Sequence, residues 1–239
     1  SDPLTHVSRC EDGQGNIHLL ISKHRGNVAP VYYMLIRKGE VVIEKRLTEG
    51  GVFARNPKIF SERSGRIHAV WQEREGKGRV KVLYANLLIR DGRVVELKKV
   101  TLSSKGAKAR HPDIFVNRKG KVFIALEDDE GISIVRISRD GRLKRKNHIA
   151  TGRYNQKLPS VFTNKNELLV AWNGSRDEVL TARLHEDGSC CFDIKRVVLK
   201  NRAFSRKITL NRWGRGIEVS FTEYEKGHMV RAHNVRRII

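Results

Sequence analysis

Short apolar runs alternate with tight turns along the whole chain. Within these runs apolar and polar residues often alternate, as in residues 31–36 (VYYMLI) and 132–137 (ISIVRI), and this is the period of a β-strand with one buried face. Glycine-containing turns recur at Lys38-Gly39, Asp91-Gly92, Asp140-Gly141 and Asp187-Gly188. Asp-Gly between two such runs favours a β-hairpin. No window carries a capped helical stripe, so the pattern predicts an all-β chain.

A proline motif recurs in step with the turns. It reads NPKIF at residues 56–60, HPDIF at 111–115 and LPSVF at 158–162, with a degenerate copy, KITL, at 207–210. Proline fits the first residue of a strand, where its missing N–H costs least. Each motif is therefore expected to open the first strand of a unit, and a strongly apolar strand follows each time.

The markers share a period of roughly 50 residues, which is the size of a four-stranded propeller blade. In one unit the strands are expected at residues 58–62, 66–72, 80–89 and 94–102. A lone meander cannot bury both of its apolar faces, but radial stacking buries them between neighbours. We therefore predict a five-bladed β-propeller of four-stranded antiparallel blades, a single domain over residues 1–239, with blades at about 5–50, 57–104, 112–151, 159–200 and 207–239.

The fifth unit is expected to be incomplete. After a third strand at residues 229–235 the chain ends before a fourth strand. Either residues 2–5 supply part of the missing strand and close the ring, or the natural protein continues. Because the sequence begins at Ser1 and not at a methionine, a removed targeting segment or a neighbouring domain stays an alternative.

Charge is the most unusual bulk property. The chain has 48 Lys and Arg against 26 Asp and Glu, a formal net charge of +22. Such a field attracts polyanions, so nucleic acid, acidic polysaccharide, an anionic lipid surface or an acidic protein are the partners it favours. No apolar stretch approaches the roughly 18 to 20 residues that cross a bilayer. The compartment stays open.

The sequence holds no pattern for a cofactor, a metal or a disulfide framework. Cys10, Cys190 and Cys191 are odd in number and lack the spacing of a zinc site, so free cysteines are expected. His18 and His68 occupy equivalent positions in two units, and this equivalence favours packing over metal ligation.

The second unit resembles the sialidase-type propeller superfamily, the bacterial neuraminidase repeats. The resemblance rests on residues 56–60 followed by 65–73 (GRIHAVWQE), 82–85 (VLYA) and Asp91-Gly92, and the third unit matches similarly. It implies the architecture of that superfamily, which includes glycosidases, polysaccharide lyases, lectins and binding domains, and so leaves the function open.

The signatures of the superfamily's enzymes are mostly absent. The Asp box is approached only at residues 138–143, where Asp and Gly are out of register and the Trp is missing, and there is no Arg-Ile-Pro motif near the N-terminus. No catalytic residue is assigned. The acids that follow the second strands carry no distinguishing local motif; they are Glu73, Glu127, Asp128, Asp129, Asp177 and Glu223.

Cations precede most of the predicted first strands. Because these positions share one face of a propeller, they are expected to gather at the mouth of the central channel and bind anions. The anion-binding candidates are Arg55, Arg110, His111, Lys157, Arg206 and Lys207, with Thr5-His6 as the equivalent in the first blade. The opposite face is also basic, with Arg66, Arg118, Lys119, Arg212, Trp213 and Arg215.

Three functions remain in play. The sequence favours a non-catalytic binding propeller that docks a polyanion, nucleic acid or acidic glycan, or an acidic protein through basic loops. The second is a sialidase-like carbohydrate-active enzyme or lectin that acts on an acidic polysaccharide. The third is a protein-interaction platform in a larger assembly, suggested by the incomplete fifth blade.

Overall fold

The computed structural model describes most of the chain. Its description leaves out residues 1–5, 76–77, 79, 91, 104–107, 139, 152–156, 165–166, 175–177, 188, 190, 199–203, 214–215, 226–227 and 239. Beyond Val198, the described side chains are those of Ile208, Leu210, Glu218 and Ser220. The described residues form strands and turns and contain no helix.

The strands form a series of antiparallel meanders. The first sheet contains β1 (His6–Glu11), β2 (Ile17–Ser22), β3 (Val31–Arg37) and β4 (Glu40–Arg46). The second contains β5 (Val52–Ser61), β6 (Arg66–Glu75), β7 (Lys81–Arg90) and β8 (Arg93–Thr101). The third contains β9 (Ala109–Val116), β10 (Val122–Asp128), β11 (Gly131–Ile137) and β12 (Leu143–Thr151).

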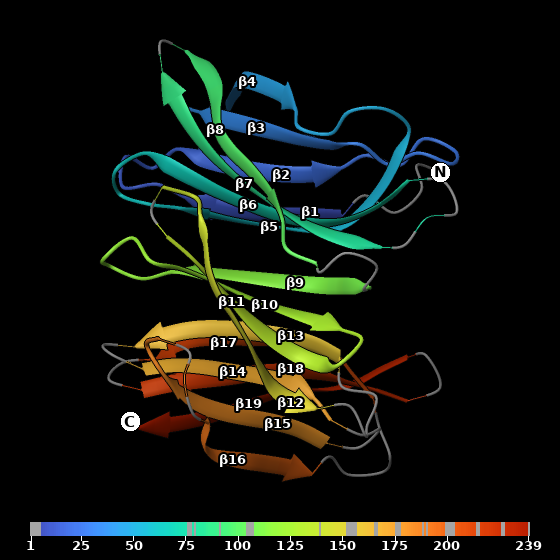
Figure 1. Ribbon diagram of the computed structural model, residues 1–239, viewed down its shortest axis with the longest axis vertical. Coiled ribbons are helices and arrows are strands. Elements are labelled where there is room, and N and C mark those ends of the chain that lie inside the picture. Colours follow the sequence, from blue (N-terminus) through green and yellow to red (C-terminus); the bar gives the residue numbers. More distant parts are fainter. Residues whose placement is uncertain are drawn as a thin grey trace.

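The remaining strands continue the same pattern. β13 (Lys157–Asn164), β14 (Glu167–Asn173), β15 (Glu178–His185) and β16 (Cys191–Val198) make a fourth sheet. β17 (Phe204–Trp213), β18 (Gly216–Glu225) and β19 (His228–Ile238) make a sheet of three strands. In each sheet consecutive strands are neighbours, so the first strand always lies at one edge (Figure 1).

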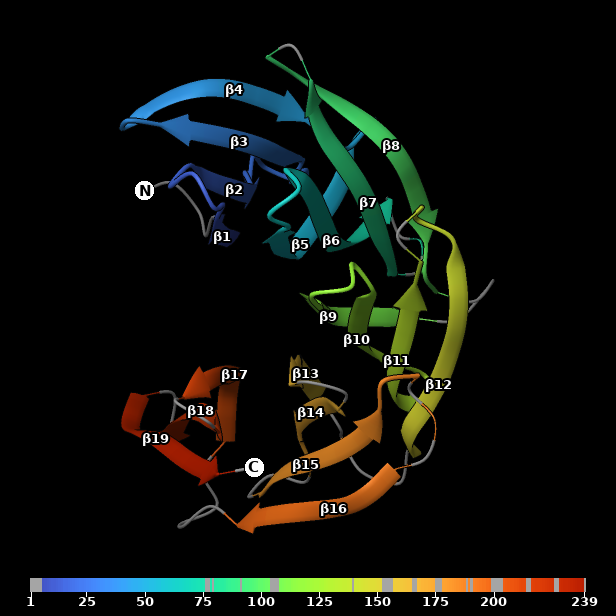
Figure 2. The ribbon, with the colours of Figure 1, turned by 90° about the vertical axis from the view of Figure 1, so that its left-hand side faces the viewer.

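The sheets are arranged around a common axis. Figure 2 shows their first strands, β1, β5, β9, β13 and β17, on the inner side and the last strands at the periphery. Successive inner strands contact one another from β1 through β5, β9 and β13 to β17. Residues far apart in the sequence therefore meet at the axis.

The apolar core lies between successive sheets. Trp71 and Leu35 belong to a cluster between the first two sheets, whereas the neighbouring Val70 points to the opposite face and packs with Ile124 of the third sheet. Two further clusters follow, around Trp172 and around Ile208. This is the radial stacking expected from strands with two apolar faces, because the second, third and fourth sheets are each covered by a neighbour on both faces.

Phenylalanines of the proline motif also join the inner strands. The ring of Phe115 lies 5.2 Å from the ring of Phe60 on one side and 4.7 Å from that of Phe162 on the other, measured between centroids. The motif therefore places one aromatic ring in each of three sheets, and tilted ring contacts of this kind stabilise packing.

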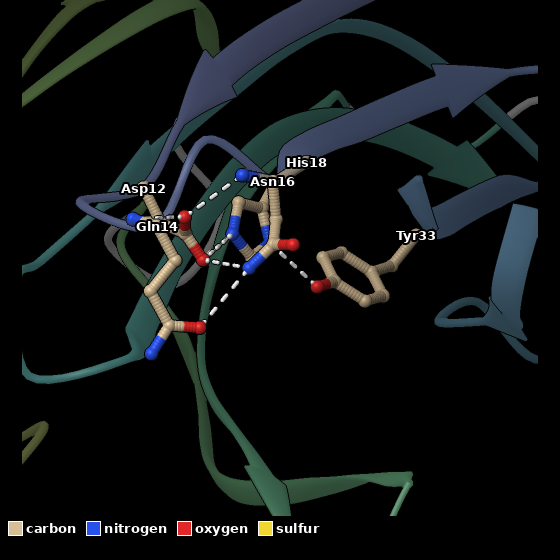
Figure 3. A network of polar contacts seen from close by, with 5 residues as sticks. All are labelled: Asp12, Gln14, Asn16, His18 and Tyr33. Carbon is tan, nitrogen blue, oxygen red and sulfur yellow. Dashed lines mark hydrogen bonds and ion pairs between the residues drawn. The ribbon is translucent and has the colours of Figure 1, made fainter. Parts of the chain in front are cut away.

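Buried polar networks hold the first turn of a sheet to its second and third strands. In the first sheet the Asp12 carboxylate accepts a hydrogen bond from His18 Nε2 at 3.2 Å, and His18 Nδ1 lies 2.7 Å from the Tyr33 hydroxyl (Figure 3). Glu62, His68 and Tyr84 repeat this arrangement in the second sheet, with both distances 2.7 Å. The equivalence of His18 and His68 thus reflects a structural role in buried packing.

Two of the inner strands begin further upstream than the sequence predicted. The proline motif was expected to open a strand, and this was wrong: β5 begins at Val52 and β9 at Ala109, upstream of Pro57 and Pro112. Each proline sits at a β-bulge within its strand, where no ladder hydrogen bond is needed from its nitrogen. The sheet of β17–β19 has three strands, and residues 2–5, which were considered for a fourth, lie outside the described residues.

Candidate functional site

A cavity of about 580 Å³ lies where the inner strands meet. Every inner strand contributes to its wall: residues 6–9 of β1, 56–58 of β5, 111–112 of β9, 158–159 of β13 and Ile208 of β17. We call it the axial cavity. Its position follows from the sheet order, because each inner strand is an edge that faces the axis.

The proline bulges shape the wall of the axial cavity. The residue before each of the three prolines has a positive φ, which is 49° at Asn56, 48° at His111 and 55° at Leu158. Positive φ is uncommon outside glycine and costs on the order of 1–3 kcal/mol in a strained position. The three sheets share this conformation, and all three residues line the axial cavity. The bulge thus redirects these side chains toward the axis.

The polar lining of the axial cavity is rich in cationic and titratable groups. It includes His6, Arg9, Lys58 and His111, together with Ser8 and Asn56. None of the described lining residues is an Asp or a Glu. The formally charged residues of this lining are therefore the cations Arg9 and Lys58.

His111 is held from two sides. Its Nδ1 lies 2.7 Å from Oε2 of Glu127, a carboxylate that is 14% exposed. Its backbone N–H donates to Oε1 of Gln72 in the preceding sheet at 2.9 Å, and the Asn56 amide donates to the same oxygen at 3.0 Å. The ring and the backbone of His111 are therefore both fixed relative to the axial cavity.

Lys58 forms an ion pair that links three sheets. Its ammonium lies 3.1 Å from Oδ1 of Asp113, while Oδ2 of Asp113 accepts hydrogen bonds from the Ser160 hydroxyl at 2.9 Å and the Val161 backbone N–H at 3.0 Å. Lys58 is 35% exposed. Its terminal ammonium is thus engaged by Asp113, and the side chain also lines the cavity.

A cationic and aromatic cluster adjoins the axial cavity at His6. The His6 ring lies 5.7 Å from that of His24, and the His24 ring packs against Phe53 at 5.0 Å. The Arg55 guanidinium lies 4.6 Å from the Phe53 ring centroid, a cation–π contact. Burial lowers the pKa of His6 below its usual 6.5, and the nearby His24 and Arg55 lower it further.

The structure describes the side chains of three of the six anion-binding candidates that the sequence suggested. His111 lines the axial cavity, whereas Arg55 is exposed beside Phe53 and Arg110 lies opposite Glu127 in the strand register. The strands contain Lys157, Arg206 and Lys207, whose side chains lie outside the described residues, as does Thr5. Their convergence at one mouth stays a prediction.

The sequence missed part of the lining. Arg9 and Lys58 were not among the candidates, because they lie within strands and their shared position appears only when the strands are aligned by register. Ser8, Lys58 and Asp113 are equivalent by that register, each paired with the corresponding residue of the second strand.

The opposite face is described only in part. Arg118 and Lys119 are exposed in the turn after β9, and Lys119 lies 3.5 Å from Glu186. Arg66 begins β6. Arg212 and Trp213 lie in β17 with side chains outside the described residues, and Arg215 is outside them altogether.

The acids considered from the sequence are engaged in local contacts. Glu73 is buried, accepts a hydrogen bond from the Trp71 indole and pairs with Lys81 at 3.1 Å. Asp128 pairs with Lys146 at 2.8 Å, and Asp129 accepts the Lys108 backbone N–H. Asp177 and the Glu223 side chain lie outside the described residues.

Other candidate chemistry is sparse in the described part of the chain. Cys10 is a free thiol, and burial raises its pKa to about 12. Cys190 and the Cys191 side chain fall outside the description. Among the described residues, no group of three or more His, Cys, Asp or Glu could hold a metal ion, and no helix could span a membrane.

Comparison with known proteins identifies the fold. No family model matches the chain, and no curated protein matches it in sequence. Solved structures do match. An exo-β-1,3-galactanase from Clostridium thermocellum is 12% identical with a TM-score of 0.60, over 96% of this chain and 57% of that one. A GH43 endo-arabinanase from Bacillus licheniformis is 11% identical with a TM-score of 0.59, over 97% and 93%.

A third match lies nearer the resemblance seen in the sequence. A neuraminidase-like protein from A/bat/Guatemala/164/2009 is 9% identical with a TM-score of 0.63, over 91% of this chain and 67% of that one. The chain shares the β-propeller fold of these structures. The resemblance of its repeats to that superfamily is thereby confirmed at the level of fold.

The comparisons also correct the functional expectation. The non-catalytic propeller that docks a polyanion, favoured from the sequence, is contradicted, because the similar propellers are mostly carbohydrate-active enzymes. The preference rested on net charge, and net charge bears on association in general and not on the chemistry of a site. The chain spans 57% of the length of the exo-β-1,3-galactanase and 58% of that of a GH43 β-1,3-galactosidase.

Proposed function

We propose that this chain is a carbohydrate-active protein that takes an acidic glycan into the axial cavity. The observation that carries the proposal is the lining of that cavity, which contains His6, Arg9, Lys58 and His111 and, among the described residues, no acid. Arg and Lys bind carboxylate and sulfate groups through charge-assisted hydrogen bonds. Such a site suits a uronate or a sulfated sugar better than a neutral one.

The size and the neighbours of the cavity support a sugar ligand. A volume of about 580 Å³ is within the range of small-molecule sites. The similar solved structures include a galactanase, an arabinanase and a neuraminidase-like protein. Their likeness is one of fold, so the sugar and the reaction of this chain are argued from its own residues.

The proposal includes a five-bladed ring. We take each of the five sheets as one blade of a single propeller domain over residues 1–239, with the first and fifth blades adjacent. In support, β1 and Ile208 of β17 line the same cavity. That a fourth strand joins the sheet of β17–β19 and closes the ring is part of this proposal.

Calorimetric titration with pentagalacturonate tests this function, with a neutral galactan pentasaccharide as the matched ligand. The acidic oligosaccharide should bind, with an affinity that falls as salt rises, because charge pairs at a solvent-accessible site are screened. The neutral one should bind at least about tenfold more weakly, a difference on the order of 1.4 kcal/mol. Equal affinity for the two would contradict the proposal.

A charge-matched variant separates the site from the bulk charge of the protein. Arg9→Gln with Lys58→Met removes two cations from the axial cavity and should weaken pentagalacturonate binding about tenfold or more. Lys144→Met with Arg145→Gln removes two exposed cations from the peripheral strand β12. If both double variants lose affinity equally, binding is due to net charge and the site assignment is wrong.

A further inference from the structure

We infer that the axial cavity cleaves a uronate glycan by β-elimination, without water, and that His111 is the base. This inference rests on the proposed function, since it names the reaction of the same site. It draws on three features: a described lining without acids, the fixed ring of His111 and the cations that line the same cavity.

Hydrolysis by paired carboxylates does not fit the described lining. Most glycosidases place two carboxyl groups on either side of the scissile bond. Here the acids that contact lining residues are already bound: Asp113 by Lys58, Ser160 and the Val161 backbone, and Glu127 by His111. Neither Asp113 nor Glu127 lines the cavity.

The His111 imidazole is arranged as a base. An ionised carboxylate only accepts hydrogen bonds, so His111 Nδ1–H donates to Glu127 at 2.7 Å. In the neutral ring this leaves Nε2 with its lone pair, the state that can take a proton. The side chain of His111 is 26% exposed and lines the cavity. Glu127 is then a positioning residue, because it selects the tautomer and holds the ring.

The cations supply what elimination requires. A proton next to a carboxylate becomes removable when the carboxylate charge is neutralised, because negative charge then develops against a cation. Arg9 lines the same cavity as His111 and can hold the uronate carboxylate, while Lys58, whose ammonium is paired with Asp113, adds a second cation to the lining.

The bond changes balance without a further reactant. His111 Nε2 takes the proton from C5 of the uronate, and the C5–H electron pair forms the C4–C5 double bond. The C4–O4 bond breaks, its electron pair leaves with O4, and O4 takes a proton from solvent. The imidazolium then returns its proton to solvent. The products are a free reducing end and an unsaturated uronate, with no net use of water.

Product analysis with pentagalacturonate tests the inference. Elimination predicts an unsaturated product that absorbs ultraviolet light where the substrate does not, and no uptake of heavy oxygen from labelled water. A saturated product that carries the label would overturn the inference while leaving the proposed function in place. A glycan that binds but is not cleaved would also overturn it, whereas loss of binding altogether would remove the proposed function as well.

Variants test the assigned roles. In His111→Gly the new glycine adopts the positive φ of this position readily, and removal of the ring leaves space for free imidazole. Cleavage should fall at least about a hundredfold and recover in part when imidazole is added. Glu127→Gln should lower kcat and leave KM within about twofold, because it disturbs the base and not the binding cations. His148→Gln, at a histidine paired with Glu130 on the peripheral strand β12, is the control and should keep full activity. No imidazole rescue, or equal loss in the control, would contradict the assignment of His111.

Discussion

At the scale of single residues, the buried histidines show how this fold satisfies polar groups. His18 is 2% exposed and has a hydrogen-bond partner at each ring nitrogen. Since the carboxylate of Asp12 accepts from Nε2, the Tyr33 hydroxyl donates to Nδ1, and the neutral ring is fully satisfied. Burial would raise the pKa of Asp12, but hydrogen bonds from Asn16, Gln14 and His18 outweigh it and lower the pKa to about 2.

The pKa shift of His18 predicts loss of stability in mild acid. Burial lowers the pKa of His18 below 6.5, against the opposing effect of Asp12, so the unfolded chain binds this proton more readily than the folded one. Stability from this group is therefore complete above pH 6.5 and is lost as pH falls toward the lowered pKa. The shift of Asp12 adds a second loss, between pH 3.8 and about 2.

Urea unfolding at pH 7.5 and pH 5 measures the effect. The free energy of unfolding of the wild type should decrease toward pH 5, and His18→Gln should be less stable at pH 7.5 but lose less between the two. Leu20→Val, which shortens a buried apolar side chain in β2, is the control and should lower the free energy of unfolding by about 1 kcal/mol at both pH values. A pH dependence that is unchanged in His18→Gln would show that other groups cause it.

At the scale of elements, the proline bulge is what converts a sheet edge into the wall of a site. Asn56 has φ of 49° and also donates to Gln72, which in turn binds the next sheet through His111. The bulge therefore sets both the direction of a lining residue and the contact between two sheets. Without the bulge, the side chain at this position would point to one face of the sheet, as in a regular strand, and would no longer be directed to the axis.

An alanine–glycine pair at Asn56 tests the bulge conformation. Positive φ costs an L-residue roughly 1–2 kcal/mol, which glycine avoids, although glycine loses more entropy on folding. Asn56→Gly should therefore be more stable than Asn56→Ala by about 0.5–1 kcal/mol in chemical unfolding. At Arg74, exposed in β6 and without positive φ, the order should be reversed. Alanine preferred at both positions would contradict the bulge.

At the scale of the whole molecule, the sequence anticipates the repeats better than the site. The strands expected at residues 66–72, 80–89 and 94–102 correspond to β6, β7 and β8, because turns and apolar runs are local signals. The upstream half of β5 was missed, since a proline inside a strand reads as its start when the bulge is not foreseen.

The site could not be assembled from the sequence for a different reason. Lys58 and Asp113 are 3.1 Å apart but belong to separate sheets, and no local pattern states that their strands meet. The net charge of the chain predicts only that anions are attracted to its surface, whereas the chemistry of the axial cavity depends on a few residues that strand register brings together. His111 was recognised because it precedes a proline, and its partner Glu127 became clear only through the pairing of β9 with β10.

The most direct test of the account is a crystal structure of the chain with trigalacturonate. The account predicts the sugar in the axial cavity, with a uronate carboxylate on Lys58 or Arg9 and the His111 ring beside C5, inside a ring of five sheets. Sugar bound only at the peripheral strands, or five sheets that leave no common cavity, would contradict it.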